Sequence, residues 1–138
     1  MKGVTMIIEY TILFTFGIII LISSMSVFRN YETYFNSVSV NDQLTAIGEY
    51  VGTNVIKLAE TGAGEDSSVT VKIPKRIGSE NYVIELSSQG LNMTSEATRV
   101  SKQSGLYGLN QTFTFSGRVS SGAGSVIIYK TGNQIMIS

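Results

Sequence analysis

A single carboxylate, Glu9, stands near the start of an otherwise apolar stretch, MKGVTMIIEYTILFTFGIIILISS. A plain membrane anchor has no use for this group, because a carboxylate in or near hydrocarbon costs about 2–3 kcal/mol. A secretory signal peptide carries a basic segment and then an uninterrupted apolar core. Glu9 therefore fits neither description, and its role has to be sought in the rest of the chain.

The composition leaves few groups for catalysis. The 138 residues include no His and no Cys, which removes the usual acid–base group, thiol nucleophiles and Cys/His zinc sites. No two carboxylates fall in a recognisable catalytic arrangement, and a Ser or Thr nucleophile has no His beside it. The acidic loop GEDSS at 64–68 has too few ligands for calcium. We therefore predict no enzyme activity, no catalytic residue, no metal site and no cofactor.

The charge balance argues against nucleic acid as a partner. Ten basic and ten acidic residues cancel, and no basic patch is present to neutralise phosphates.

The residues from Val4 to Phe28 are apolar apart from Glu9 and scattered Thr, Ser and Tyr. As a helix they span roughly 38 Å, enough to cross a bilayer of about 30 Å. Lys2 favours an N-terminus inside the cell, which leaves the rest of the chain outside.

Apolar residues keep a helical spacing beyond Arg29, with one break at 39–43. The stripe consists of Tyr31, Tyr34 or Phe35, Val38, Leu44, Ile47, Val51, Val55 and Leu58. Tyr31 and Tyr34 fit either an interfacial aromatic belt or packing under the following domain. Gly48 and Gly52 weaken a helix by about 1 kcal/mol each, so packing must hold it. We predict one long helix, apolar all round over 4–28 and amphipathic over 29–60.

The remaining residues have the pattern of a linker and a small β domain. The segment 61–68, TGAGEDSS, has loop composition, and Gly62 is the predicted helix cap. Over 69–138 the apolar period becomes two, which predicts about four to six short antiparallel strands. The predicted buried faces contain Val69, Val71 and Ile73; Tyr82, Ile84 and Leu86; and Phe113, Phe115 and Val119. Thr131-Gly132-Asn133 predicts a hairpin. The predicted fold class is α+β, with the long helix packed on a small antiparallel sheet.

Two sequons lie in this β domain. Asn92-Met93-Thr94 and Asn110-Gln111-Thr112 both match the N-glycosylation pattern. Such triplets also arise by chance in chains rich in Asn and Thr. Asn92 and Asn110 are therefore candidate glycosylation sites, on the condition that the domain is exported.

The order of these elements resembles the type IV pilin superfamily, which includes bacterial pilins and pseudopilins, archaeal pilins and archaellum components. The motif part of the resemblance lies in the first dozen residues, where Lys2-Gly3 and then Val4 to Glu9 look like a class III signal. The resemblance implies that a prepilin-type peptidase cuts between Gly3 and Val4, so that residues 1–3 form a leader. It also implies insertion in the cytoplasmic membrane of the cell envelope, followed by assembly into an extracellular filament.

In such a filament the apolar helices form the core, as a homopolymer or with related pilin-like subunits. The resemblance implies that Glu9 pairs there with the N-terminal amine of a neighbouring subunit, which makes a buried carboxylate tolerable. Cleavage after Gly3 makes Glu9 the sixth mature residue, whereas the usual bacterial motif has it fifth. This offset and the short leader favour an archaeal member, and the offset weakens the case for pairing. The alternative is a carboxylate at the headgroup boundary, where the helix dipole favours it.

Two functions follow as hypotheses. The first is a structural, glycosylated subunit of a type IV pilus-like filament, assembled through its N-terminal helix. The alternative is a single-pass membrane-anchored envelope protein whose β domain binds a partner, such as an archaellum stator-type component or a surface-layer contact. The stripe from Tyr31 to Leu58 bears on this choice, because a bare anchor gains nothing from an amphipathic continuation, although a β domain that docks on the helix would use the same stripe.

Overall fold

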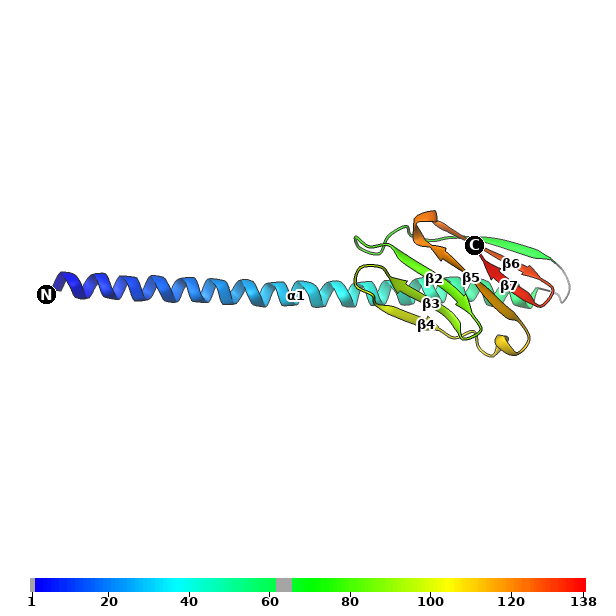
Figure 1. The fold of residues 1–138 in the computed structure, drawn as a ribbon, viewed down its shortest axis with the longest axis horizontal. Coiled ribbons are helices and arrows are strands. Elements are labelled where there is room, and N and C mark those ends of the chain that lie inside the picture. The colour runs from blue at the N-terminus through cyan, green and yellow to red at the C-terminus, as the bar shows by residue number, and fades with distance from the viewer. Residues whose placement is uncertain (1, 62–65) are drawn as a thin grey trace. The chain divides into compact units, whose positions relative to one another are not determined.

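The computed structural model describes residues 2–61 and 66–138, which form an α+β fold, as predicted. Figure 1 shows helix α1 and the strands. The bounds are α1 Lys2–Glu60, β1 Ser67–Lys72, β2 Tyr82–Ser87, β3 Gly90–Ser95, β4 Ser101–Ser104, β5 Thr114–Ser120, β6 Ser125–Thr131 and β7 Gln134–Ile137, with 3-10 turns η1 Leu109–Gln111 and η2 Ser121–Ala123. The chain divides into an N-terminal unit, Met1–Asn36, and a C-terminal unit, Ser37–Ser138. Helix α1 runs through both.

The strands form one sheet in the order β1-β6-β7-β5-β2-β3-β4. The prediction of about four to six antiparallel strands was wrong in number. Strand β4, SKQS, has no apolar residue because it is an edge strand, so the period-two signal is missing. The orientation was also wrong for one pair, because β5 and β7 are parallel. Strand β7 lies between β5 and β6 in the sheet, and it forms the hairpin with β6.

The predicted hairpin and strand faces are confirmed. Thr131 of β6 pairs with Gln134 of β7, and Gly132 between them has φ 56°, a value that favours glycine. The inward faces also match the prediction. Buried there are Val71, Ile73, Tyr82, Ile84, Leu86, Phe115 and Val119, with Val69 and Phe113 packed partly buried against them.

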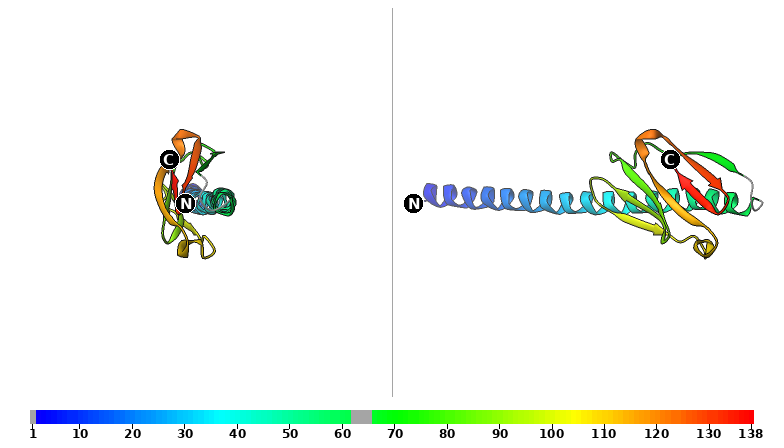
Figure 2. Two further views of the ribbon diagram at one scale, coloured as in Figure 1. Left: turned by 90° about the vertical axis from the view of Figure 1, so that its right-hand side faces the viewer. Right: turned by 45° about the vertical axis from the view of Figure 1, so that its right-hand side comes forward.

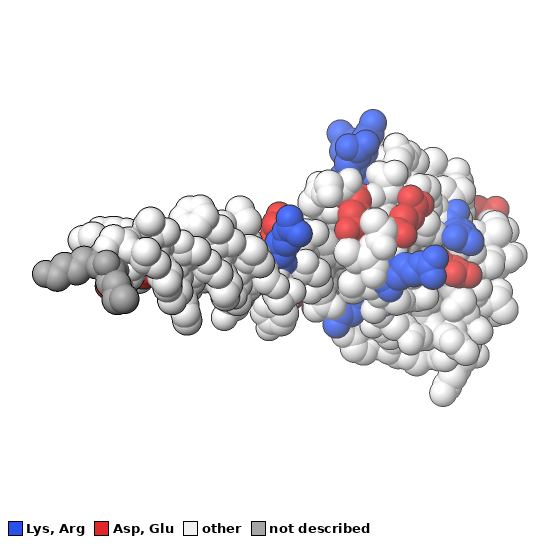
Figure 3. All heavy atoms as spheres, turned by 60° about the vertical axis from the view of Figure 1, so that its left-hand side comes forward, with Lys and Arg blue, Asp and Glu red and all other residues white. Residues whose placement is uncertain are grey.

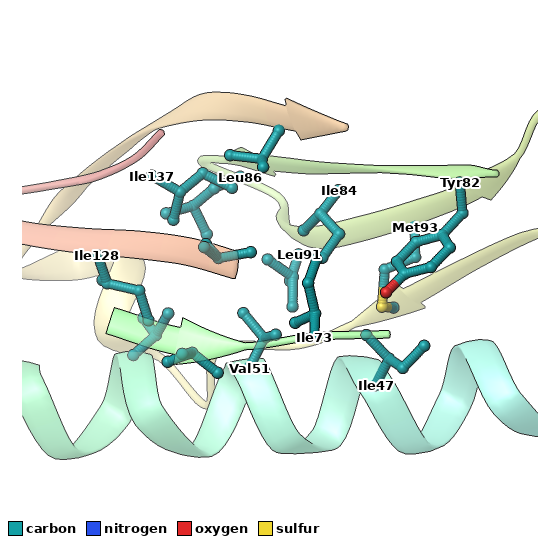
Figure 4. Close-up of a cluster of buried hydrophobic side chains, with 14 of the residues drawn as sticks. Ile47, Val51, Ile73, Tyr82, Ile84, Leu86, Leu91, Met93, Ile128 and Ile137 are labelled. Carbon is teal, nitrogen blue, oxygen red and sulfur yellow. The ribbon is translucent and has the colours of Figure 1, made fainter. Parts of the chain in front are cut away.

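The core lies between this sheet and the part of α1 that belongs to the C-terminal unit (Figure 2). Six helix residues are at most 7% exposed: Val40, Leu44, Ile47, Val51, Val55 and Leu58. Figure 4 shows Ile47 and Val51 directed from the helix toward Leu91 and Met93 of β3. The predicted stripe is thus confirmed from Leu44 onward. It begins at Val40 rather than Tyr31, because Tyr31, Tyr34 and Val38 are exposed.

Gly48 and Gly52 are buried on the same side of the helix. A methyl group at Gly48 would overlap the end of the Met93 side chain, and one at Gly52 would lie 3.7 Å from Ser104 Oγ. These glycines therefore face Met93 of β3 and Ser104 of β4. The Met93 side chain occupies the space that a side chain at residue 48 would need, which accounts for the glycine there despite its cost in helix propensity.

A buried lysine of the sheet caps the C-terminal end of α1 by hydrogen bonds. Lys130 of β6 is 1% exposed, and its Nζ donates to the carbonyl oxygens of Ala59, at 3.4 Å, and of Thr61. These carbonyls have no partner inside the helix, and the helix dipole favours a cation there. The predicted cap, Gly62, lies outside the described residues. The predicted linker 61–68 is shorter than expected, because Ser67 and Ser68 already pair with β6.

Candidate functional site

The apolar residues of the N-terminal unit are exposed on all sides of α1. From Val4 to Phe28, the large hydrophobic side chains keep between 44% (Ile18) and 75% (Phe28) of their surface exposed. On the face drawn in Figure 3, most of this surface carries no charge. Among the described residues, α1 is the one helix long and apolar enough to cross a membrane, by length and composition. Such a surface requires an apolar environment around its circumference, either lipid or other helices.

The hydroxyl groups within this apolar segment are bonded to the helix itself. Thr11 Oγ1 donates to the Ile7 carbonyl and Thr15 Oγ1 to the Thr11 carbonyl, both at 2.8 Å. These bonds lower the cost of placing the hydroxyls in hydrocarbon. A methyl group at Gly17 would meet no atom of the described chain within 4 Å. The segment is therefore suited to apolar surroundings despite its polar residues.

The three residues predicted near the N-terminus all lie on α1. Gly3 and Val4, the predicted cleavage residues, are exposed, and Glu9 is exposed about one and a half helical turns further along. No residue in the described part of the chain hydrogen-bonds or ion-pairs with the Glu9 carboxylate. The Glu9 carboxylate is therefore exposed on the apolar segment.

An aromatic collar, defined as Phe28, Tyr31, Tyr34 and Phe35, follows the apolar segment. Its members are at least 59% exposed. The ring centres of Tyr31 and Phe35 lie 6.4 Å apart, and those of Tyr34 and Phe35 lie 6.0 Å apart. Tyr31 and Tyr34 are thus exposed within the N-terminal unit, and the alternative that they pack under the β domain stays a prediction. Exposed aromatic rings at the end of an apolar segment are typical of a membrane interface.

The two sequons occupy different environments. Asn92 is half-buried on β3, the middle of three adjacent strands, and its Oδ1 accepts a hydrogen bond from Ser101 Oγ at 2.8 Å. Asn110 is exposed in the turn η1, and its Nδ2 donates to the Ser88 carbonyl oxygen at 3.4 Å. Glycosylation acceptors are expected in surface loops, so Asn110 is the better placed of the two.

Sequence reasoning missed a polar hollow on the solvent face of β2, β3 and β4. Its volume is about 450 Å³, and its lining consists of Glu85, Ser87, Gln89, Asn92, Ser101 and Gln103. The alternation in β2 indicated a polar outer face. The hollow could not be predicted, because it needs the register with β4, a strand that has no apolar signal.

One perturbed carboxyl has a structural role in the C-terminal unit. Glu80 Oε2 accepts hydrogen bonds from Ser95 Oγ at 2.7 Å and from the Thr98 main-chain N and Oγ1, both at 3.1 Å. These bonds, with that from Ser95 the largest cause, lower the pKa of Glu80. They tie residue 80 to the loop between β3 and β4. Within the described ranges, no group of three or more His, Cys, Asp or Glu residues is placed to hold a metal ion.

Comparison with known proteins places the chain in a family. No curated protein matches the chain, and no solved structure does. Over residues 2–138 the chain matches a family described as "Family of unknown function (DUF7266)". The match spans the apolar segment, the amphipathic helix and the sheet together. This chain is therefore a member of family DUF7266.

Proposed function

We propose that this protein is a structural subunit of an extracellular type IV pilus-like filament, inserted in the cytoplasmic membrane before it assembles. The observation that supports this proposal is an apolar surface exposed on all sides of α1 from Val4 to Phe28, with a carboxylate inside it. Lipid covers the surface but leaves Glu9 uncompensated, at a cost of about 2–3 kcal/mol. A bundle of neighbouring helices covers the same surface and brings a cationic amine to Glu9.

In this proposal a prepilin-type peptidase cuts between Gly3 and Val4, and the new amine of Val4 pairs with Glu9 of a neighbouring subunit. The C-terminal unit has a core of its own, so its folding does not depend on burial of the apolar segment. The sheet is then free to form the filament surface. The filament is a homopolymer or contains related pilin-like subunits.

A second candidate is supported by the aromatic collar. Exposed rings at the end of an apolar segment are what a permanently inserted helix places at the headgroups. In this alternative the protein is a single-pass anchored envelope protein that never polymerises. Its β domain binds a partner, such as an archaellum stator-type component or a surface-layer contact.

The deciding experiment is intact mass and N-terminal sequencing of the protein from its native cells, in sheared filament and membrane fractions. We expect a chain starting at Val4 in the filament fraction. Glu9→Gln should lower the filament share about tenfold, as loss of a pair worth about 1.4 kcal/mol predicts, and leave the membrane share intact. Glu32→Gln, which changes a carboxylate beyond the apolar segment, is the matched control and should assemble normally.

The opposite result has an equally clear meaning. A chain that still starts at Met1 and stays in the membrane fraction would contradict the filament proposal and favour the anchored protein. Equal assembly of the Glu9→Gln and Glu32→Gln variants would contradict the pairing of Glu9 alone, because the offset in the motif would then have removed its role.

A further inference from the structure

The polar hollow of the sheet has an unusually uniform chemistry. Its lining offers one carboxylate, three side-chain amides and two hydroxyls: Glu85; Gln89, Asn92 and Gln103; and Ser87 and Ser101. An amide presents donors and an acceptor together, and a hydroxyl does the same on a smaller scale. The six lining residues include no lysine, no arginine and no aliphatic or aromatic side chain. The lining of the hollow can thus both donate and accept hydrogen bonds.

The strand register sets three of these side chains in a row. Glu85 of β2 pairs with Asn92 of β3, and Asn92 pairs with Gln103 of β4. Alternate side chains of a strand point to the same face, so all three emerge on the solvent side. Neighbouring strands lie about 4.8 Å apart, and the row therefore extends over about 10 Å. That length matches a chain of hydroxyl groups better than a single small ion.

Hydrogen bonds inside the hollow orient two of the amides. Ser101 Oγ donates to Asn92 Oδ1 at 2.8 Å, and Gln103 Nε2 donates to the Gln89 carbonyl oxygen at 2.9 Å. Each bond takes up one acceptor position of the Asn92 oxygen or one N–H of the Gln103 nitrogen. They leave the Asn92 Nδ2 as a donor and the Gln103 Oε1 as an acceptor for a ligand, beside the carboxylate of Glu85.

The lining disfavours other classes of ligand. A phosphate or carboxylate ligand would meet Glu85, and the nearest cation in the strand register, Arg118 of β5, pairs with Glu85 but is not part of the lining. Apolar contact drives most small-molecule binding, and this lining has no aliphatic or aromatic side chain to provide it. An apolar ligand would therefore gain little. A calcium ion takes six to eight oxygens and usually several carboxylates, whereas the lining has one. A neutral ligand with many hydroxyl groups can donate to the carboxylate and amide oxygens of the lining and accept from its amide N–H groups.

We propose that this hollow binds a saccharide through its hydroxyl groups, with Glu85, Asn92 and Gln103 as the recognition row. Two sources supply this chemistry: a glycan on another surface, or a glycan attached to Asn110 of the same chain. Asn110 Nδ2 contacts the carbonyl oxygen of Ser88, which lies between two lining residues, Ser87 and Gln89. A glycosylated amide keeps one N–H, so one donor remains at Asn110 after modification. The proposal requires export of the sheet, which both candidate functions include.

The test uses the full chain made in cells without N-glycosylation and held in a detergent that has no sugar headgroup. It is applied to an array of immobilised neutral oligosaccharides with gluco, galacto and manno configurations. We expect retention on at least one class. Glu85→Gln and Gln103→Ala should each weaken it about tenfold, as the loss of one good hydrogen bond predicts. Glu96→Gln and Gln111→Ala change exposed residues outside the hollow and should have no effect.

Protein from the native cells separates the two sources. If a glycan on Asn110 fills the hollow, native protein binds the array more weakly than the unglycosylated chain, and Asn110→Gln restores binding. If the ligand belongs to another surface, native and unglycosylated proteins bind alike. The proposal is overturned if the unglycosylated chain retains no oligosaccharide, or if Glu85→Gln and Gln103→Ala bind as well as the control variants. Array binding is read separately from filament assembly, so failure of one proposal leaves the other intact.

Discussion

The two parts of α1 share one helical backbone but have opposite surroundings. In the C-terminal unit, apolar residues form a single stripe from Val40 to Leu58 that is buried under the sheet. In the N-terminal unit they cover every side of the helix and are exposed. A stripe matches a partner on one side, which the same chain supplies, whereas an apolar circumference needs partners on all sides. The distribution of apolar residues around a helix therefore indicates whether its partner lies inside the chain or outside it.

The largest expected contrast comes from removing the same side chain in both parts. Leu44 is 0% exposed and Leu21 is 59% exposed. Leu44→Ala should lower the free energy of unfolding of the C-terminal unit by about 2–5 kcal/mol, through lost burial and a cavity. Leu21→Ala should change it by less than about 0.5 kcal/mol. Urea unfolding in detergent micelles, followed by the near-UV circular dichroism of tyrosine, measures both.

Similar losses for the two leucines would contradict the comparison, because they would mean that the apolar segment contributes to the folding of the sheet. A loss for Leu44 alone would show that the two parts are energetically independent. Leu21→Ala would then be a clean variant for assays of membrane insertion and assembly.

The sequence allowed prediction of those parts of the fold that depend on local periodicity or turn chemistry. The inward face of Tyr82, Ile84 and Leu86 and the hairpin at Gly132 are of this kind. Features that depend on distant contacts could not be predicted. Strand β4 is defined by its pairing with β3, and the partners of Lys130 at the end of α1 lie 69 and 71 residues away along the chain.

The candidate site divides in the same way. Glu9 could be predicted as a candidate residue, because a carboxylate among apolar neighbours is visible in the sequence itself. The polar hollow has no such signal, because Glu85 and Gln103 are ordinary polar residues until the register sets them in one row. Asn92 was found only through its sequon, which says nothing about a hollow.

A second contrast uses glycine. Gly117 has φ 131°, and a methyl group there would overlap the main chain of Ile137 on β7. Gly117→Ala should therefore lower the free energy of unfolding by about 2–3 kcal/mol. Gly17→Ala, in the open part of α1, meets no such atom and should leave the C-terminal unit unchanged while it favours the helix by about 1 kcal/mol.

The same urea measurement tests these glycine variants, since it reports the unfolding of the sheet. Gly117→Ala with wild-type stability would show that β5 and β7 separate easily, contrary to the close approach at this position. For Gly17→Ala, reduced filament yield with unchanged unfolding would place a neighbouring helix against residue 17, as small residues permit in helix bundles.

The smallest contrast concerns two carboxylates, Glu9 and Glu80. The partners of Glu80 all lie in its own chain, and their hydrogen bonds lower its pKa from the usual 4.5. A group with a lowered pKa in the folded state stabilises the protein above its unfolded-state pKa, near 4.5, and this stabilisation is lost as the pH falls through the lower folded-state value. Glu80→Gln should therefore reduce stability at pH 7 and flatten the decline in melting temperature below about pH 4.5. Glu96→Gln, on an exposed neighbour, should keep the wild-type profile. An unchanged decline in Glu80→Gln would mean that other carboxyls carry the acid sensitivity and that the loop between β3 and β4 does not need the charge.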